Sequence, residues 1–226
     1  MKTVKINTVS KNFEHKREGR ILAFQALYSY EFEHKAHEEG FAVVCGVDEA
    51  GRGPLAGPVY AAAVILPDGL EDMGINDSKK MSEKKREALF DIIIENATAY
   101  GIGFATETEI DEINILNATF LAMKRAVEGL VIKPDFAYID GNQYPKTGVK
   151  EETIVKGDGK CISVAAASII AKVSRDRFML EIDKQYPEYQ FSKHKGYGTK
   201  LHYEMIEKYG VSKVHRRSFL KKILGE

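Results

Sequence analysis

The sequence predicts an α/β domain whose mixed β-sheet is flanked by helices and followed by a helical C-terminal part. Two patterns along the chain predict this class. Short apolar, β-prone segments alternate with longer segments of helical periodicity, as expected for a sheet covered by helices. From Tyr186 onward the chain becomes polar and basic, and it carries one further helical stretch to about Tyr209.

Five segments are expected to form the strands. The first delivers two adjacent carboxylates, Asp48 and Glu49, into a loop of Gly, Arg, Gly and Pro. A hairpin-like loop joins it to the second segment, so the sheet should begin with an antiparallel pair. The expected strands cover residues 43–47, 57–66, 98–106, 136–140 and 153–155.

The helices are recognised from apolar residues at spacings of three and four and from their end signals. Ser82 is expected to cap one helix and Gly129 to end the next. The helix from Ser163 opens with the small residues Ala165–Ser168, which would let it pack closely on the sheet. The N-terminal amphipathic helix is interpreted as a packing helix. The expected helices cover residues 13–37, 82–96, 111–129, 163–183 and a stretch ending near 209.

The charge of the chain is unevenly distributed, although 33 Lys and Arg balance 33 Asp and Glu. Residues 156–226 hold 15 basic and 8 acidic side chains, a net charge of +7, which leaves −7 for residues 1–155. A basic C-terminal third beside an acidic remainder favours a phosphate-binding surface next to a metal site. Chance clustering of charges on solvated helices is the alternative. The length of 226 residues allows one domain with an extension or two small domains.

The two cysteines, Cys45 and Cys161, have no metal-ligand spacing and lie in apolar surroundings. We therefore expect buried free thiols in a reducing cytoplasm. Residues 1–20 lack the apolar core of a signal peptide. The longest apolar run, Val59–Pro67, is far too short to cross a bilayer. A soluble cytoplasmic protein is expected.

The candidate chemistry lies at the ends of three strands. Asp48 and Glu49 close the first, Asp140 closes the fourth, and Asp158 follows the fifth, each beside a Gly-containing loop. If these ends gather at one edge of the sheet, the four carboxylates need cations between them to stay ionised. Two Mg²⁺ or Mn²⁺ ions held in this way suit in-line attack on a phosphodiester. An ordinary strand ending in a polar turn is the alternative for each end taken alone.

These residues lie in motifs that resemble bacterial ribonuclease HII. The resemblance runs in order from about residue 42 to residue 220. It is carried by DEAGRGPLAGPV at 48–59, NDSKKMS at 76–82, NILNATFLAM at 114–123, YIDGN at 138–142, KGD at 156–158, SVAAASIIAKVSRDRFM at 163–179, HKGYGT at 194–199 and HRRSF at 215–219.

The resemblance implies a ribonuclease H-like fold with a mixed five-stranded sheet, and a metal-dependent endoribonuclease. Such an enzyme hydrolyses the RNA strand of RNA–DNA hybrids and cuts 5′ to ribonucleotides embedded in duplex DNA. It leaves 3′-hydroxyl and 5′-phosphate ends. The implied cofactors are two Mg²⁺ or Mn²⁺ ions, and the implied partners are these nucleic acids, with no membrane. A monomer is expected.

The resemblance also assigns roles to residues. Asp48, Glu49, Asp140 and Asp158 would be the catalytic, metal-binding carboxylates. The loop of Gly51, Arg52 and Gly53 would sense the 2′-hydroxyl, the group that distinguishes RNA from DNA. Tyr197 would pack against the sugar that follows the ribonucleotide. Phosphate contacts are expected from Lys79, Lys80, Lys172 and Arg175.

Other polar residues receive plainer interpretations. Lys172 and Arg175 could instead only solvate a helix face, with Asp176 pairing with one of them. His194 and His215 lie in basic stretches without a second ligand at metal spacing, so phosphate contact or solvation is expected of them. His202 is expected to be partly packed, and Asp77, in a loop, is left out of the site.

The N-terminus departs from the family pattern, because about 40 residues precede the first motif. We therefore expect an N-terminal extension at 1–40 and a catalytic domain at 41–226, whose basic helical region from about 185 to 226 binds substrate. Two alternatives remain. One is a type III ribonuclease H, although 40 residues are too few for its N-terminal domain. The other is a hybrid-binding protein without activity, which clustered carboxylates argue against.

Overall fold

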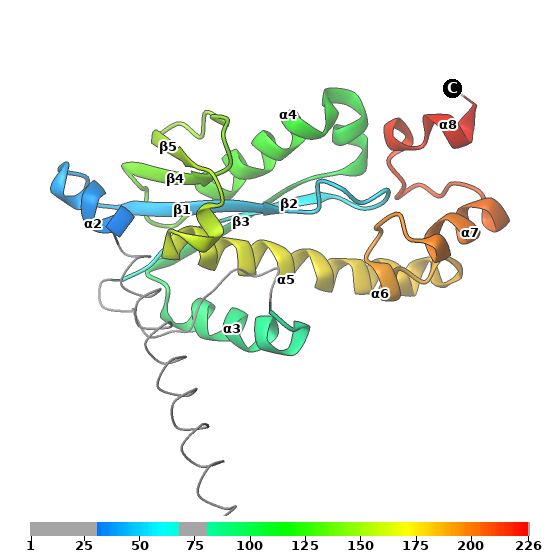
Figure 1. The fold of residues 1–226 in the computed structure, drawn as a ribbon, viewed down its shortest axis with the longest axis horizontal. Helices are drawn as coiled ribbons and strands as arrows, with labels where there is room; N and C mark the ends of the chain where they lie inside the picture. The colour runs from blue at the N-terminus through cyan, green and yellow to red at the C-terminus, as the bar shows by residue number, and fades with distance from the viewer. Residues whose placement is uncertain (1–30, 68–80, 226) are drawn as a thin grey trace, which may run out of the picture.

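The computed structural model describes residues 31–67 and 81–225 (Figure 1). Most of the expected N-terminal helix, Asp77 and the expected phosphate contacts Lys79 and Lys80 lie outside these residues. Only the last part of that helix is described, as α2 (Glu31–Glu38).

The sheet has five strands in the order β3-β2-β1-β4-β5, with β1, β2 and β3 antiparallel and β4 and β5 parallel to β1. This is the mixed sheet that the sequence predicts. The strands are β1 (Val44–Ala50), β2 (Val59–Ile65), β3 (Ala99–Ala105), β4 (Phe136–Asp140) and β5 (Lys150–Ile154).

The helices form two layers on the sheet and a separate group at one end of it (Figure 1). One face is covered by α4, and the other by α5 with α3 outside it. The group at the end is α6, α7 and α8. Their bounds are α3 (Glu83–Asn96), α4 (Glu107–Glu128), α5 (Ile162–Gln185), α6 (Phe191–His194), α7 (Lys200–Tyr209) and α8 (Lys221–Leu224), with 3-10 turns η2 (Gly157–Gly159), η3 (Pro187–Tyr189) and η4 (Arg217–Phe219).

The long helix α5 lies unusually close to β1, as its small residues predict. A Cβ built on Gly46 would stand 2.1 Å from the carbonyl carbon of Ser163. Any side chain at Gly46 would therefore push α5 off the sheet. The same helix face buries Ala166, Ala167 and Ile170 against the sheet, so the close approach sets the depth at which α5 faces β1.

Two boundaries differ from the expected ones. Helix α4 begins at Glu107 rather than near 111, because Thr106 and Glu109 form a capping box one turn earlier. Asn114 has φ 67° inside it, and its side chain accepts the N–H groups of Leu116 and Asn117. Strand β5 begins at Lys150, where its polar side chains on the edge of the sheet hide the apolar pattern.

The C-terminal part has an apolar core of its own around Phe191. Three imidazoles surround this ring, with centroid distances of 5.7 Å for His194, 5.5 Å for His202 and 5.8 Å for His215. All three histidines are buried. The expectation of phosphate contact or solvation for His194 and His215 is therefore wrong, because both rings are buried against Phe191.

Helix α2 is attached to the domain by a buried carboxylate. One oxygen of Glu33 accepts hydrogen bonds from the Ser163 N–H (3.0 Å), the Ser163 hydroxyl (2.6 Å) and the Cys161 thiol (3.0 Å). Ser163 lies in the first turn of α5, where N–H groups lack partners within the helix. Burial and the charge of Glu33 raise the pKa of the Cys161 thiol well above its usual value, which keeps the thiol a donor. Glu33 therefore caps α5 from another helix.

Both cysteines are buried free thiols, as expected. Among the described helices, none has an apolar stretch long enough for a bilayer.

We predict that Glu33→Ala lowers the free energy of unfolding by about 1–3 kcal/mol, because it leaves buried donors at the start of α5 without their acceptor. Urea unfolding of the full chain measures the change. The matched control is Glu38→Ala, which removes an exposed carboxylate from the same helix and should change the value by no more than about 0.5 kcal/mol. Equal effects of the two substitutions would contradict the cap.

We predict that the protein loses stability as the pH falls from 7 to 5. Burial lowers the pKa of His202 and of His215 to about 4, and lowers that of His194. The unfolded chain binds protons near the ordinary pKa of about 6.5, whereas the folded protein does not until much lower pH. The free energy of unfolding should therefore fall by on the order of 2 kcal/mol over this interval.

Urea unfolding at pH 7, 6 and 5 measures this dependence. His34→Gln changes an exposed histidine of α2 and serves as the control that should keep the same pH dependence. The raised pKa of Asp48 acts in the opposite direction over this interval, so the measurement is made in the Asp48→Asn background. A free energy of unfolding that stays constant or rises toward pH 5 in that background would refute the expectation.

Candidate active site

The adjacent carboxylates Asp48 and Glu49 lie within β1, near its end, rather than after it. Successive side chains of a strand point to opposite faces. Val47 belongs to the core on the α4 side, so Glu49 shares that face and Asp48 turns toward α5. Glu49 is partly exposed, whereas Asp48 is buried with 1% of its surface accessible. The two neighbours therefore offer carboxylates on either side of one strand.

Asp48 is a carboxyl in an environment that disfavours its charge. Burial raises its pKa well above the usual value, and the charges of Glu49 and Asp140 raise it further. A hydrogen bond from the Ser168 hydroxyl of α5 and one from the Glu49 N–H (2.7 Å) act in the opposite direction. The oxygen Oδ2 of Asp48 is buried and accepts no hydrogen bond from any residue in 31–67 or 81–225. A buried acceptor without a donor is costly, and a cation beside this oxygen would remove the cost.

Asp140 stands next to Asp48 across the strand pair, since Val47 pairs with Ile139 in the parallel register of β1 and β4. Its oxygen Oδ1 accepts the N–H of Gly157 at 2.6 Å. Gly157 opens the turn η2, in which Asp158 is buried. Asp158 thus lies in a 3-10 turn beyond β5 rather than at the strand end itself. One hydrogen bond connects the segments that carry these two carboxylates.

The structure brings the four expected carboxylates to the same edge of the sheet, on β1, the end of β4 and η2. Within residues 31–67 and 81–225, however, no three His, Cys, Asp or Glu side chains converge tightly enough to hold a metal ion as they stand. The alternation of Asp48 and Glu49 across β1 accounts for this spread. The hard oxygen donors and the unpartnered Asp48 oxygen fit a divalent cation such as Mg²⁺ or Mn²⁺.

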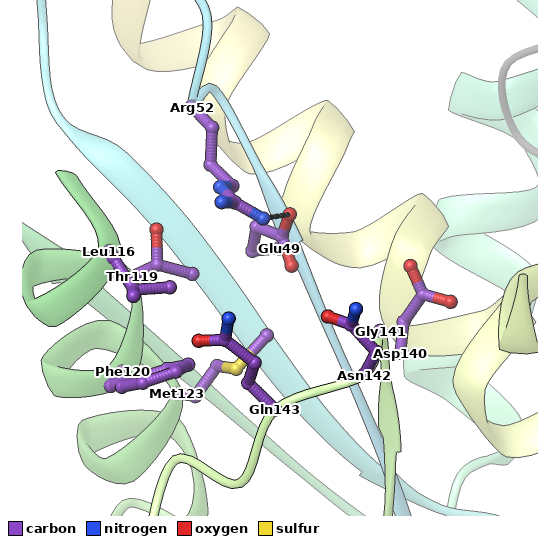
Figure 2. A pocket seen from close by; sticks show the side chains of 10 residues that line it. All are labelled: Glu49, Arg52, Leu116, Thr119, Phe120, Met123, Asp140, Gly141, Asn142 and Gln143. Atoms are coloured by element: carbon purple, nitrogen blue, oxygen red, sulfur yellow. Dashed lines mark ion pairs between the residues drawn. The ribbon is translucent and has the colours of Figure 1, made fainter. Parts of the chain in front are cut away.

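Arg52 and Glu49 face a small cavity of about 60 Å³ (Figure 2). Their ion pair has a 3.7 Å separation between Nη1 and Oε1. Arg52 is half exposed, so the pair is weak and its guanidinium can exchange Glu49 for another anion. The remaining wall comes from α4 and from the loop after β4. Its residues are Leu116, Thr119, Phe120, Met123, Asp140, Gly141, Asn142 and Gln143.

A buried arginine holds the loop of Gly51, Arg52 and Gly53 in shape. The Arg216 guanidinium donates to the carbonyl oxygens of Gly51 (2.7 Å) and Arg52 (3.0 Å). It also donates to the carbonyls of Pro54 at 2.8 Å and Gly57 at 2.8 Å. Burial, reinforced by the neighbouring positive charge of Arg175, lowers the pKa of Arg216 to about 9, so the side chain stays charged at neutral pH.

Arg175 is a second buried support of this loop, and the expected phosphate contact is wrong for it. Its guanidinium is inaccessible to solvent and donates to the carbonyls of Pro58 (3.0 Å), Lys195 (3.0 Å) and Ala56 (3.1 Å). A Cβ on Gly51, whose φ is +97°, would lie 2.1 Å from the Arg175 Nε. Gly51 is thus required by its conformation and by this arginine.

Tyr197 lies beside the same loop. A Cβ built on Gly53 would stand 3.8 Å from the Tyr197 ring, and 40% of Tyr197 remains accessible. The Lys172 ammonium lies 5.6 Å from the ring centroid, and it pairs with Asp176 at 2.7 Å, as one interpretation of the sequence anticipates. The expected 2′-hydroxyl loop and the expected junction tyrosine therefore form one surface.

Comparison with known proteins identifies the family of this chain. The family model described as Ribonuclease HII matches residues 45–222. A Ribonuclease HII from Caldicellulosiruptor bescii is 55% identical over 196 residues, which cover 87% of this chain and 95% of that protein. The chain belongs to the ribonuclease HII family. It is therefore a ribonuclease H, an endonuclease of the hydrolase class, as the motifs predict. This membership favours neither the type III enzyme nor a binding protein without activity.

Solved structures confirm the ribonuclease H fold. The ribonuclease H2 from Pyrococcus horikoshii OT3 matches with a TM-score of 0.67 at 31% identity, covering 78% of this chain and 93% of that one. Bst-RNase HIII in complex with Mn²⁺ matches with a TM-score of 0.61 at 18% identity, covering 77% and 65%, and supports the fold alone.

Two residues of this ribonuclease HII site are missed by the sequence reasoning. Arg216 lies within the motif HRRSF, but a basic side chain in a basic tail predicts solvent exposure or phosphate contact. Ser168 is recognised only as a small residue of α5. A usable signal is the combination of Arg216 with the glycines at 51 and 53, since the carbonyls of a buried loop without regular secondary structure need a donor.

We predict that Asp48→Asn raises the free energy of unfolding of the metal-free protein at pH 7 by about 1 kcal/mol or more. A carboxyl whose folded-state pKa is raised lowers stability as the pH rises above the unfolded pKa of about 3.9, and asparagine carries no charge. Adding Mg²⁺ or Mn²⁺ should raise the unfolding temperature of the original protein but not that of the variant.

Thermal unfolding with and without EDTA and metal measures both effects. Glu112→Gln, which removes an exposed carboxylate on α4, is the control and should leave the metal response intact. An equal response to metal in Asp48→Asn and the original protein would remove Asp48 from the metal site.

Proposed function

We propose that this protein hydrolyses the RNA strand of RNA–DNA hybrids and cuts 5′ to ribonucleotides embedded in duplex DNA. The observation that carries the proposal is the buried, unpartnered oxygen of Asp48. Asp48 lies beside Asp140 across the β1–β4 pair, and Asp140 accepts the N–H of Gly157, the residue before Asp158. Asp48 is one residue from Glu49 and a few residues from the Arg52 loop. The products are a 3′-hydroxyl and a 5′-phosphate.

The residues that would hold the metal are Asp48, Glu49, Asp140 and Asp158. When bound, two Mg²⁺ or Mn²⁺ ions would supply an activated water and neutralise the charge on the leaving 3′ oxygen. The protein's own contribution is to bring the carboxylates together at an energetic cost. The raised pKa of Asp48 indicates this cost, because the folded chain keeps a carboxyl where its charge is disfavoured.

The Arg52 loop and Tyr197 are proposed to recognise the substrate. The 2′-hydroxyl is what separates RNA from DNA, and main-chain groups of Gly51 to Gly53 can hydrogen-bond to it because glycine leaves the backbone accessible. The exposed part of the Tyr197 ring is proposed to pack against the sugar on the 3′ side of the ribonucleotide. The Leu55 N–H of the loop donates to the carbonyl of Gly196, the residue before Tyr197, at 2.8 Å, which supports one recognition surface made by the loop and the tyrosine.

Phosphate contacts are proposed for Lys172, beside Tyr197, and for Lys79 and Lys80. The net charge of +7 over residues 156–226 supports a nucleic-acid surface in the C-terminal part. We propose that residues 41–226 form the catalytic domain and act as a monomer, with 1–40 as an extension that contributes α2. The buried free thiols support a cytoplasmic location.

We predict that the protein nicks a DNA duplex with one ribonucleotide on the 5′ side of that residue in Mg²⁺ or Mn²⁺. An otherwise identical all-DNA duplex should stay intact, because it lacks the 2′-hydroxyl. Denaturing electrophoresis of end-labelled strands maps the cut, and sensitivity of the fragment ends to a phosphatase identifies the terminal groups. Equal cutting of both duplexes would refute the proposal.

Asp140→Asn is the matched active-site variant. It should reduce cleavage by at least about a hundredfold and leave binding of the duplex within about threefold, since the carboxylate serves metal rather than substrate affinity. Asp135→Asn is an unsuitable control, because Asp135 binds the Ala42 and Val43 N–H groups. Glu112→Gln serves again as the control and should cleave normally.

A further inference from the structure

Three buried histidines, His194, His202 and His215, form a cluster that contacts the backbone of Tyr197, the residue proposed to pack against the substrate. The rings of His194 and His202 stack with a centroid separation of 4.4 Å and an angle of 20° between planes. The ring of His215 lies 5.2 Å from that of His202. The cluster lies outside the carboxylate site, and the hydrolysis proposed above does not use it.

Main-chain donors assign the tautomers of the two outer rings. The Ser212 N–H points at Nδ1 of His215 at 3.0 Å, so this nitrogen carries no proton and Nε2 does. The Gly196 N–H points at Nδ1 of His194 at 3.2 Å, so the proton of His194 is also on Nε2. From there it is donated to the Tyr189 carbonyl at 3.0 Å.

The tautomer of the central ring follows from its neighbour. Nε2 of His202 lies 3.0 Å from Nε2 of His215, which is protonated, so the His202 nitrogen must accept. The proton of His202 is therefore on Nδ1, which donates to the carbonyl oxygen of Tyr197 at 3.0 Å. The hydrogen bonds thus run in one direction, from Ser212 through His215 and His202 to Tyr197.

This direction requires neutral rings. A second proton on His202 would place two N–H groups against each other at the His215 contact. Burial lowers the pKa of both rings to about 4, which agrees with neutral rings near pH 7. The hydrogen-bond geometry alone already excludes a charged His202 in this arrangement.

The backbone on both sides of Tyr197 is held by the stacked pair. His194 accepts the N–H of Gly196, whose φ of +84° turns the chain toward the 51–58 loop. The Tyr197 carbonyl accepts from Nδ1–H of His202 at 3.0 Å and from the Thr199 N–H at 2.8 Å. The Tyr197 ring lies 3.8 Å from the position that a Cβ on Gly53 would take, and this placement depends on the orientation of these two peptide units.

We propose that His202 is a positioning residue that, by donating from Nδ1 to the Tyr197 carbonyl, sets the Tyr197 ring for the RNA–DNA junction. This inference rests on the proposed function of Tyr197. It predicts that His202 affects the choice between substrates, and that it does so through one ring nitrogen rather than through its bulk.

Substitution of His202 by asparagine or by glutamine distinguishes the role of Nδ1 from that of Nε2. The amide nitrogen of asparagine is as many bonds from Cα as Nδ1, so His202→Asn can still donate to the Tyr197 carbonyl. The amide of glutamine reaches as far as Nε2, so His202→Gln keeps the His215 contact and loses the donor to Tyr197. Both variants remove the ring, and both should unfold at lower temperature.

The readout is kcat/KM on a duplex with one ribonucleotide divided by kcat/KM on a long hybrid. We expect His202→Gln to lower this ratio about fivefold, as for the loss of one hydrogen bond, and His202→Asn to stay within about twofold of the original protein. Tyr197→Ala, assayed alongside, should lower the ratio at least as much as His202→Gln. Assays are run well below the unfolding temperature of each variant.

The outcomes distinguish a failure of the role of His202 from a failure of the proposed function of Tyr197. Equal ratios in the asparagine and glutamine variants overturn the role of His202. If Tyr197→Ala leaves the ratio unchanged, the proposed function of Tyr197 fails, and this inference fails with it. Failure of the original protein to cut either substrate would refute the function itself.

A second measurement does not depend on activity. Long-range ¹H–¹⁵N spectra of the ¹⁵N-labelled full chain report which ring nitrogen carries the proton. We expect the Nδ1–H form for His202 and the Nε2–H form for His194 and His215, with the His202 signals identified by their loss in His202→Asn. An Nε2–H form of His202 would overturn the proposal.

Discussion

The hydrogen bonds between two buried guanidiniums and the carbonyls of residues 51–58 are the interaction on which the site depends. Arg216 and Arg175 lie inside the loop and donate to carbonyl oxygens along it. The same loop bonds to the C-terminal part, since the Leu55 N–H donates to the Gly196 carbonyl at 2.8 Å. The planar Arg216 guanidinium, with five donors in a fixed fork, donates to four carbonyls at once, whereas a lysine ammonium has only three donors. The loop and the segment around Tyr197 are therefore one unit.

The carboxylates near the ends of β1 and β4 differ from the loop, because here burial and neighbouring negative charges disfavour the ionised form of Asp48. Asp48 is buried on the α5 side of β1 with an oxygen that accepts no hydrogen bond, and Asp140 is its neighbour on β4. Close packing of α5 over Gly46 keeps water from this point. A carboxylate held rigidly and away from water attracts a cation strongly. The nearby loop, held by hydrogen bonds from Arg216 and Arg175, keeps a fixed conformation for substrate binding.

Both ends of the described chain are attached through buried polar contacts rather than through apolar packing alone. At one end Glu33 caps α5, the helix that faces Asp48. At the other end the hydrogen bonds through His215 and His202 reach the backbone of Tyr197. Such contacts require their partners in one geometry. They explain how segments outside the sheet can influence groups at its edge.

The sequence by itself located the strands and the longer helices to within a few residues and singled out the acidic residues near the strand ends, because periodicity, caps and strand-end carboxylates are local signals. Ser82 caps the start of α3 and Gly129 caps the end of α4, as expected. Only the tertiary structure decided the roles of Arg175, Arg216 and the three histidines. Charged and polar side chains normally indicate exposure, and their burial depends on partners far along the chain. Arg216 and Gly51 are 165 positions apart. No local pattern encodes a contact at that separation.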